Sequence, residues 1–198
     1  MFSRYFTSSR PISNTLTCRM LQGGFGLIEL MVSISIIVLV AGIVLANQSS
    51  FNSAVLLRNQ AYEIALTLRE VQLNAVSSSG DAGVFRSVMG VYFDSLILND
   101  RYRVFRDGDA DYHYSAASED YGALGRLDKR FEIRTITDSN GNLHNDISVV
   151  FERPNFDARF FDGVGEIPAE SVQIEVGRVG SADVRVIEVT TSGQIAVI

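Results

Sequence analysis

The residues from Gly23 to Ala46 read GGFGLIELMVSISIIVLVAGIVLA. Between Phe25 and Ala46 the only charged side chain is Glu29. At about 1.5 Å per helical residue this span is roughly 33 Å long, enough to cross the hydrocarbon core of a bilayer. A carboxylate near the start of an apolar run is costly in lipid, and for that reason it usually has a function. The stretch therefore predicts a membrane-inserted helix and marks Glu29 as a functional residue.

The residues before the apolar run, 1–24, are basic and rich in Ser and Thr. Their charged side chains are Arg4, Arg10 and Arg19. In a secretory signal peptide an apolar core of about 7–15 residues precedes the cleavage site, whereas here the apolar run follows the glycines. Basic flanks stay on the cytoplasmic side of a membrane. We therefore expect a cytoplasmic N-terminus and an exported C-terminal part.

The order of Gly24, Phe25 and Glu29 resembles the signature of type IV prepilins. The resemblance implies that a prepilin peptidase cuts after Gly24 and methylates Phe25, the new N-terminal residue. It also implies that Glu29, the fifth mature residue, pairs with the N-terminal amine of a neighbouring subunit in the filament. An uncleaved signal anchor is the alternative, but it leaves the Gly24-Phe25 junction and Glu29 unexplained.

Composition limits the partners of the mature chain. The complete chain has a net charge of −6, and removing the three arginines of 1–24 leaves 14 basic against 23 acidic side chains, or −9. Sequence-independent binding to nucleic acid depends on neutralising phosphates, so we expect no nucleic-acid partner. Cys18 is the only cysteine and belongs to the leader, so the mature chain can form no disulfide, unlike many major pilins.

The helical pattern continues beyond the apolar run. Apolar residues recur there at spacings of three and four, which predicts one buried face of an amphipathic helix: Ala54, Leu57, Ala61, Ile64, Leu68, Val71 and Ala75. Charged residues interleave with this stripe as a solvated or partner-facing side: Arg58, Glu63, Arg69 and Glu70. We predict one helix over residues 25–79, with a transmembrane half over 25–46.

The remaining residues, 80–198, are predicted to form a β-rich head. Short strand-like runs are separated there by Gly, Asp, Asn and Ser: Val88–Phe93, Ser95–Leu98, Tyr102–Phe105, Phe131–Thr137, Ile147–Phe151, Val172–Val176, Val184–Val189 and Gln194–Ile198. The expected fold class is α+β, a long N-terminal helix packed on an antiparallel, sandwich-like head. The stretch 61–80 resembles the helix end of pseudopilin H and of the FimT-type minor pilins.

The segment 107–125 is the least strand-like part of the head and is predicted to be a surface loop that contacts partners. Asp107, Asp109 and Asp111 alternate there as in the first half of an EF-hand, which makes them candidate calcium ligands. Tyr112 and Ser118 stand where that motif needs a glycine and a glutamate, so a solvated acidic loop is the preferred interpretation.

Other polar groups in the head have simpler interpretations. The run DSNGN at 138–142 favours a turn over a set of oxygen ligands. His113 and His144 have no cysteine partner in the mature chain and no zinc-ligand spacing, so we expect no zinc site. Apart from the weak calcium candidates in the acidic loop, no metal and no cofactor is predicted. The sequence contains no nucleophile elbow, phosphate-binding loop or dinucleotide fingerprint, which predicts that the protein is not an enzyme.

The predicted function is that of a structural subunit of a type IV pilus or a type II secretion pseudopilus. Its partners would be prepilin peptidase, other pilin subunits and, before assembly, the lipid of the cytoplasmic membrane. Two alternatives remain. The first is a filament-tip module that binds DNA or a secreted substrate. The second is an exported domain, such as an enzyme, that stays anchored in the membrane without processing.

Overall fold

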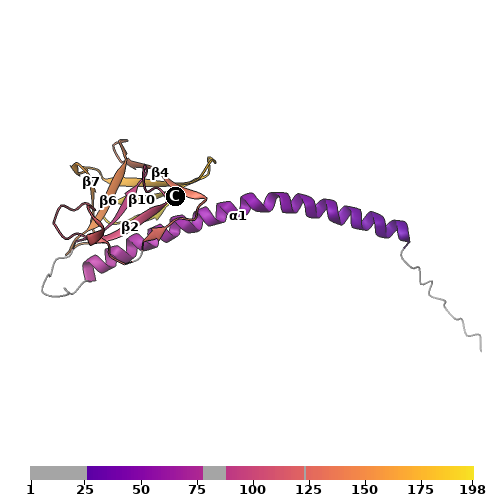
Figure 1. The fold of residues 1–198 in the computed structure, drawn as a ribbon, viewed down its shortest axis with the longest axis horizontal. Coiled ribbons are helices and arrows are strands. Elements are labelled where there is room, and N and C mark those ends of the chain that lie inside the picture. The colour runs from indigo at the N-terminus through magenta and orange to yellow at the C-terminus, as the bar shows by residue number, and fades with distance from the viewer. Residues whose placement is uncertain (1–25, 78–87, 123) are drawn as a thin grey trace, which may run out of the picture. The chain divides into compact units, whose positions relative to one another are not determined.

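The computed structural model describes residues 26–77, 88–122 and 124–198, without the side chains of 46–51. The chain divides into two compact units, Met1–Ala46 and Asn47–Ile198. Both units contain part of a single helix, α1 (Leu27–Ser77) (Figure 1).

In the first unit α1 is a fully exposed apolar helix. Its hydrogen bonding begins where Leu30 N donates to Gly26 O at 3.1 Å. The hydroxyls of Ser33 and Ser35 donate to the carbonyls one turn earlier, so these polar groups are satisfied within the helix, as lipid requires. The segment Leu27–Leu45 has a mean hydropathy of 2.7, none of it is buried, and its length and composition suit a membrane span.

The second unit contains two antiparallel sheets. The six-stranded sheet has the order β3-β2-β1-β6-β7-β8, with strands β1 (Met89–Asp94), β2 (Arg101–Arg106), β3 (Gly125–Arg126), β6 (Asp146–Phe151), β7 (Ala158–Asp162) and β8 (Gly165–Glu166). The five-stranded sheet has the order β11-β10-β9-β4-β5, with strands β4 (Phe131–Asp138), β5 (Leu143–His144), β9 (Ser171–Arg178), β10 (Val184–Thr190) and β11 (Ile195–Val197). A 3-10 helix, η2 (Ala117–Glu119), lies between β2 and β3.

One hydrophobic core joins the inner faces of both sheets to the part of α1 in this unit. The helix contributes a row of buried residues: Leu57, Ala61, Ile64, Ala65, Leu68, Val71 and Ala75. The strands contribute residues such as Val91, Phe131 and Ile174. Ala54, predicted to belong to the buried row, is exposed, and Ser53 is buried at that turn instead.

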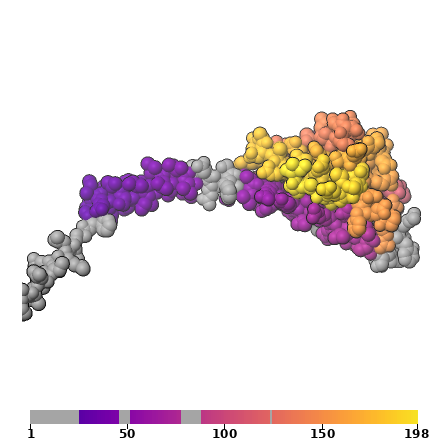
Figure 2. Space-filling view, turned by 180° about the vertical axis from the view of Figure 1, so that it is seen from behind, coloured from indigo at the N-terminus to yellow at the C-terminus, as the bar shows by residue number. Residues whose placement is uncertain are grey.

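Side-chain hydrogen bonds fix the helix on this core. Gln72 donates to the carbonyls of Phe156 and Gly193 at 2.7 and 3.0 Å. Arg69 donates to the carbonyl of Ile195 at 3.1 Å, and the C-terminal residues lie beside the helix in Figure 2. Because these carbonyls lie in the connections and the edge strand of the sheets, the bonds set the position of α1 along the head.

The predicted fold class, α+β with a long helix and an antiparallel two-sheet head, is confirmed. The predicted strand Ser95–Leu98 is wrong. A carboxylate oxygen of Asp94 accepts the backbone N–H groups of Leu96 and Ile97 at 2.7 and 2.8 Å, which makes a turn of this segment. Each of the other predicted runs overlaps a strand, but β7 and the two-residue strands β3, β5 and β8 were not predicted.

Candidate functional site

Glu29 lies in the first turn of α1, where the exposed N–H groups of the helix favour a negative charge. Its carbonyl accepts a hydrogen bond from the hydroxyl of Ser33 at 2.7 Å. No cation of the described residues forms an ion pair with the Glu29 carboxylate. Gly24 and Phe25, the predicted cleavage and methylation sites, lie outside the described residues. The role of Glu29 therefore stays a prediction.

The apolar side chains around Glu29 are exposed on every side of the helix. Leu27 and Ile28 are 79% and 74% exposed, and Leu45, at the other end of the segment, is 66% exposed. Water is an unfavourable environment for so much apolar surface, because each square ångström costs about 25 cal/mol when it is not buried. This segment requires lipid or other helices around it.

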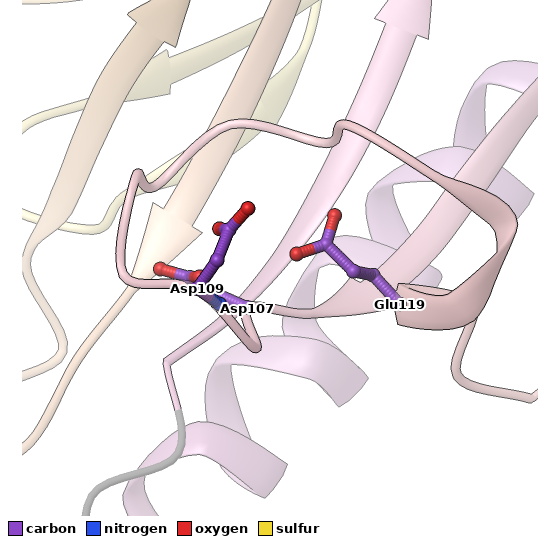
Figure 3. A group of neighbouring side chains, drawn as sticks. All are labelled: Asp107, Asp109 and Glu119. Atoms are coloured by element: carbon purple, nitrogen blue, oxygen red, sulfur yellow. Dashed lines mark hydrogen bonds between the residues drawn. The ribbon is translucent and has the colours of Figure 1, made fainter.

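The acidic loop brings together Asp107, Asp109 and Glu119, rather than the predicted trio with Asp111 (Figure 3). One carboxylate oxygen from each of the three lies within 4.8 Å of the others. Asp111 lies outside this group, and its carboxylate accepts the backbone N–H of His113 at 2.8 Å. Sequence reasoning missed Glu119 because it follows Ser118, the position that an EF-hand would require, by one residue.

The three carboxylates already accept hydrogen bonds from the loop itself. Asp107 accepts the N–H groups of Ala110 and Tyr112 at 2.7 and 3.1 Å, and Glu119 accepts that of Ser115 at 2.9 Å. Burial raises the pKa of Asp107, although these N–H bonds oppose the rise. Three such oxygens could hold a hard cation, and they also suffice to shape the loop.

Residues 107–121, here called the strap, cover the outer face of the six-stranded sheet with aromatic rings. Tyr112 stacks on Phe161 with centroids 5.0 Å apart and an interplanar angle of 12°. Tyr114 lies 5.1 Å from Tyr92 and 5.8 Å from Phe105. The segment is a surface loop, as predicted, and most of its residues are exposed, but one side of it packs on the head. Its contact with partners stays a prediction.

The two histidines bind carboxylates within the head. His113 lies 3.1 Å from the Ser148 hydroxyl and 3.2 Å from the Asp146 carboxylate, which attaches the strap to β6. His144 lies 3.4 Å from Asp138 and 3.2 Å from Asp162. In the described parts of the chain, neither histidine belongs to a group of three potential metal ligands.

The turn at 138–142, predicted from Asn140-Gly141, is present and has Asp138 at its centre. The Asp138 carboxylate accepts the N–H groups of Asn140 and Asn142, each at 2.8 Å, and the Asn142 side-chain amide at 2.9 Å. Burial alone would raise the pKa of Asp138, but the hydrogen bonds from Asn142, His144 and Asn140 lower it to about 2.

A cavity of about 530 Å³ opens between the 139–140 turn and the segments around β7 and β8. Its polar lining includes Arg159 and Glu166, which form an ion pair at 2.9 Å. Ser139, also in the lining, accepts the N–H of Glu170 at 3.0 Å. These polar groups therefore already have partners within the chain. Among the described residues of the lining, no nucleophile is paired with a general base.

Comparison with known proteins identifies one segment of the chain. The family model of the prokaryotic N-terminal methylation motif matches residues 19–45. The motif and the apolar helix support a type IV pilin-like protein, a class of membrane-anchored substrates of prepilin peptidase. No curated protein and no solved structure was found to match the chain. The resemblance of the head to pseudopilin H and to the FimT-type minor pilins therefore stays a prediction.

Proposed function

We propose that this chain is cut after Gly24, methylated on Phe25 and assembled as a structural subunit of a type IV pilus or a type II secretion pseudopilus. One observation supports this most strongly. A carboxylate, Glu29, begins a fully exposed apolar helix inside the matched methylation motif. A simple anchor needs the apolar length but has no use for the charge.

The segment Leu27–Leu45 has two successive environments in this proposal. Before assembly it spans the cytoplasmic membrane, with the leader in the cytoplasm and the head exported. After extraction, the apolar surface is covered by the same segment of neighbouring subunits. In that apolar surrounding a lone carboxylate requires a cationic partner, and the N-terminal amine of a neighbour's Phe25 meets the requirement.

The head is the variable part of such a subunit and distinguishes pilin, minor pilin and pseudopilin. Some arginines of the head form ion pairs with carboxylates, such as Arg103 with Asp120 at 3.0 Å and Arg159 with Glu166 at 2.9 Å. A tip module that binds DNA gains no support from the net charge of −9 that the mature chain would carry, because such binding depends on neutralising phosphates.

Mass spectrometry of the N-terminus tests the proposal. We expect the membrane-bound chain to begin at an N-methylated Phe25 when a prepilin peptidase is present, and at Met1 when it is absent. A chain that keeps Met1 in the presence of the peptidase would return the protein to the class of unprocessed signal anchors. Abundance of the chain in sheared filaments would then separate a major from a minor subunit.

A further inference from the structure

Basic side chains gather at one end of the five-stranded sheet, the end where β4 begins and β9 finishes. The register places Arg178 opposite Phe131 at the start of β4. It also places Arg185 of β10 opposite Val176, two residues before Arg178. We give the name basic end to three charged segments that meet here: 54–60, 126–131 and 178–185.

The loop between β3 and β4 joins the basic end to α1. The side chain of Gln60 accepts the N–H of Asp128 at 2.9 Å, and Arg58 precedes Gln60 by less than one helical turn. The N–H of Val179 donates to the carbonyl of Arg130 at 2.8 Å. These bonds bring the helix, the loop and the turn after β9 together at one end of the head.

The basic end has the opposite charge to the rest of the chain. Its three segments contain six basic and two acidic side chains, a net charge of +4: Arg58, Arg126, Lys129, Arg130, Arg178 and Arg185, with Asp128 and Asp183. Since the mature chain as a whole carries −9, its other residues carry −13. Positive charge is therefore concentrated on a small part of an acidic protein.

Most of these cations are free to meet a partner. Arg130 pairs with Asp128 at 2.8 Å, but the other five form no ion pair within the described residues. Arg185 donates to the carbonyl of the preceding residue at 2.9 Å, and the guanidinium of Arg58 lies 5.4 Å from the centre of the Tyr62 ring. All five side chains are at least partly exposed to solvent.

Exposed apolar side chains accompany the cations. Val179, directly after Arg178, is 53% exposed. Ile198 is 66% exposed and exchanges two backbone hydrogen bonds with Val186 of β10, which places the C-terminus marked in Figure 1 at the same end of the sheet. Helices that bind the surface of a bilayer combine cations and apolar side chains in the same way, with the charges at the headgroups.

The basic end is close to the membrane span along the chain. Thirteen residues separate Leu45 from Arg58, and as a helix they are at most about 20 Å long. The headgroup region takes up about 5–8 Å of this length, and membrane-spanning helices are tilted by about 20° on average. The long side chains of the basic end can therefore reach the headgroups while Leu27–Leu45 stays in the hydrocarbon core.

We propose that the basic end docks on anionic headgroups of the bilayer that holds Leu27–Leu45, until the chain enters a filament. Guanidinium groups bind the phosphates of such lipids through paired hydrogen bonds, and an ammonium group binds them as a point charge. The other residues of the mature chain, with their −13, are repelled by the same surface. The head therefore turns its basic end to the membrane and the rest of its surface away.

Lipid is favoured over a nucleic acid because the span already holds the headgroups beside the head. A tethered partner is present at a high effective concentration, so a few weak contacts are enough. A soluble polyanion has no such tether, and it also meets the −13 of the other residues. The inference rests on the proposed function only for the insertion of Leu27–Leu45 in a membrane.

Fluorescence quenching in lipid nanodiscs tests the docking in the full chain. Cys18→Ser removes the only cysteine, and Ala182→Cys, at an exposed position of the turn after β9, carries the fluorophore. The nanodiscs contain phosphatidylcholine alone or mixed with phosphatidylglycerol, together with a lipid that carries a quencher on its headgroup. We expect severalfold stronger quenching with phosphatidylglycerol at about 0.1 M salt. This excess should vanish at about 1 M, where the Debye length falls from about 10 Å to about 3 Å.

Charge variants identify the residues that dock. Lys129→Gln combined with Arg185→Gln should lower the ratio of docked to free heads at least about fivefold, since each cation near an anionic surface strengthens the attraction by about that factor. Leu143→Glu combined with Val164→Glu is the matched control. It makes the net charge equally more negative on β5 and the β7–β8 turn, at positions 72% and 97% exposed. It should leave the quenching at Ala182→Cys unchanged.

Equal quenching in the two lipids at low salt, or an equal loss in the matched control, would overturn the inference. So would a fluorophore that responds to duplex DNA but not to phosphatidylglycerol. Each of these results leaves the proposed function intact, because the N-terminal residue is measured separately. Docking by a chain that keeps Met1 in the presence of prepilin peptidase would support the inference and contradict the proposed function.

Discussion

The Nδ1 atom of His144 lies 3.2 Å from the Oδ2 atom of Asp162, which links β5 of one sheet to β7 of the other. The second ring nitrogen, Nε2, lies 3.4 Å from Asp138 at the end of β4. Hydrogen bonds to carboxylates are stronger than those between neutral groups. One imidazole therefore joins the two layers of the head beside the 138–142 turn.

Low pH should reduce the stability of the folded head, because it protonates Asp138. Its pKa is about 2 in the folded chain, below the ordinary 3.8. The unfolded chain therefore takes up a proton first as pH falls, so this carboxylate stabilises the fold above about pH 4 and the contribution is lost between about pH 4 and pH 2. Thermal unfolding of the full chain in detergent, followed by near-UV circular dichroism, should show the midpoint falling across this window.

The substitution Asp138→Asn tests this assignment. It should lower the midpoint at pH 7, because charged hydrogen bonds are lost, and make the decline between pH 4 and pH 2 shallower. Asp157→Asn, at an exposed aspartate, is the matched control. An Asp138→Asn chain with an unchanged acid profile would assign the pH dependence to other carboxylates.

Replacing Glu29 should block assembly and spare processing. Glu29→Ala removes one partner of the ion pair that we propose between subunits, and losing one partner of such a pair in an apolar surrounding costs about 3–5 kcal/mol. We expect recovery in sheared filaments to fall at least about tenfold, since each 1.4 kcal/mol is about one power of ten, while cleavage after Gly24 continues. Ser35→Ala is the control, because the Ser35 hydroxyl bonds only within its own helix. Filament levels of Glu29→Ala equal to those of the control would contradict the proposed role.

Gln72 should be required for the attachment of α1 to the head. Gln72→Ala removes the donor to the carbonyls of Phe156 and Gly193, two part-buried hydrogen bonds that contribute about 0.5–1.5 kcal/mol each. Asn59→Ala, at an exposed position of the same helix, should have little effect. The measurement is the midpoint of thermal unfolding, which should be lower for Gln72→Ala than for Asn59→Ala. Equal midpoints would show that the hydrogen bonds of Gln72 do not stabilise the fold.

Gly90 should not tolerate a side chain. A Cβ atom there would lie 2.6 Å from the Phe105 ring and 2.9 Å from the carbonyl oxygen of Val149. Gly90→Ala should therefore destabilise the head by about 1–3 kcal/mol, as overpacking does. Gly163→Ala is the comparison, because no atom lies within 4 Å of the added carbon. Urea unfolding measures both, and equal midpoints would rule out the clash.

The sequence predicted the helix and the long strands because their signals are local. The apolar run, the spacing of Leu57, Ile64 and Leu68, and the alternation around Val184 each require only neighbouring residues. The strand Ser95–Leu98 was mispredicted because its apolar side chains outweighed Asp94, the residue that makes the turn.

The strap and the histidine contacts were not predicted because they join residues far apart in the chain. Tyr112 meets Phe161, and His144 meets Asp162, only after the sheet has formed. Composition alone predicts that the strap is a surface loop, and no local spacing shows that its tyrosines face the sheet. Glu119 was missed for a different reason, since the ligand spacing of an EF-hand places the last carboxylate at residue 118.

The aromatic cover over the six-stranded sheet also restricts how this protein can diversify. Exposed loops of a filament subunit are where insertions and substitutions are easily accepted. Here the segment with the most loop-like composition holds Tyr112, Tyr114 and His113 against β1, β6 and β7. An insertion in the strap would move its aromatic rings off the sheet. We therefore expect sequence variation on the surface of homologous heads to concentrate in shorter connections, such as the exposed Gly163-Val164 turn.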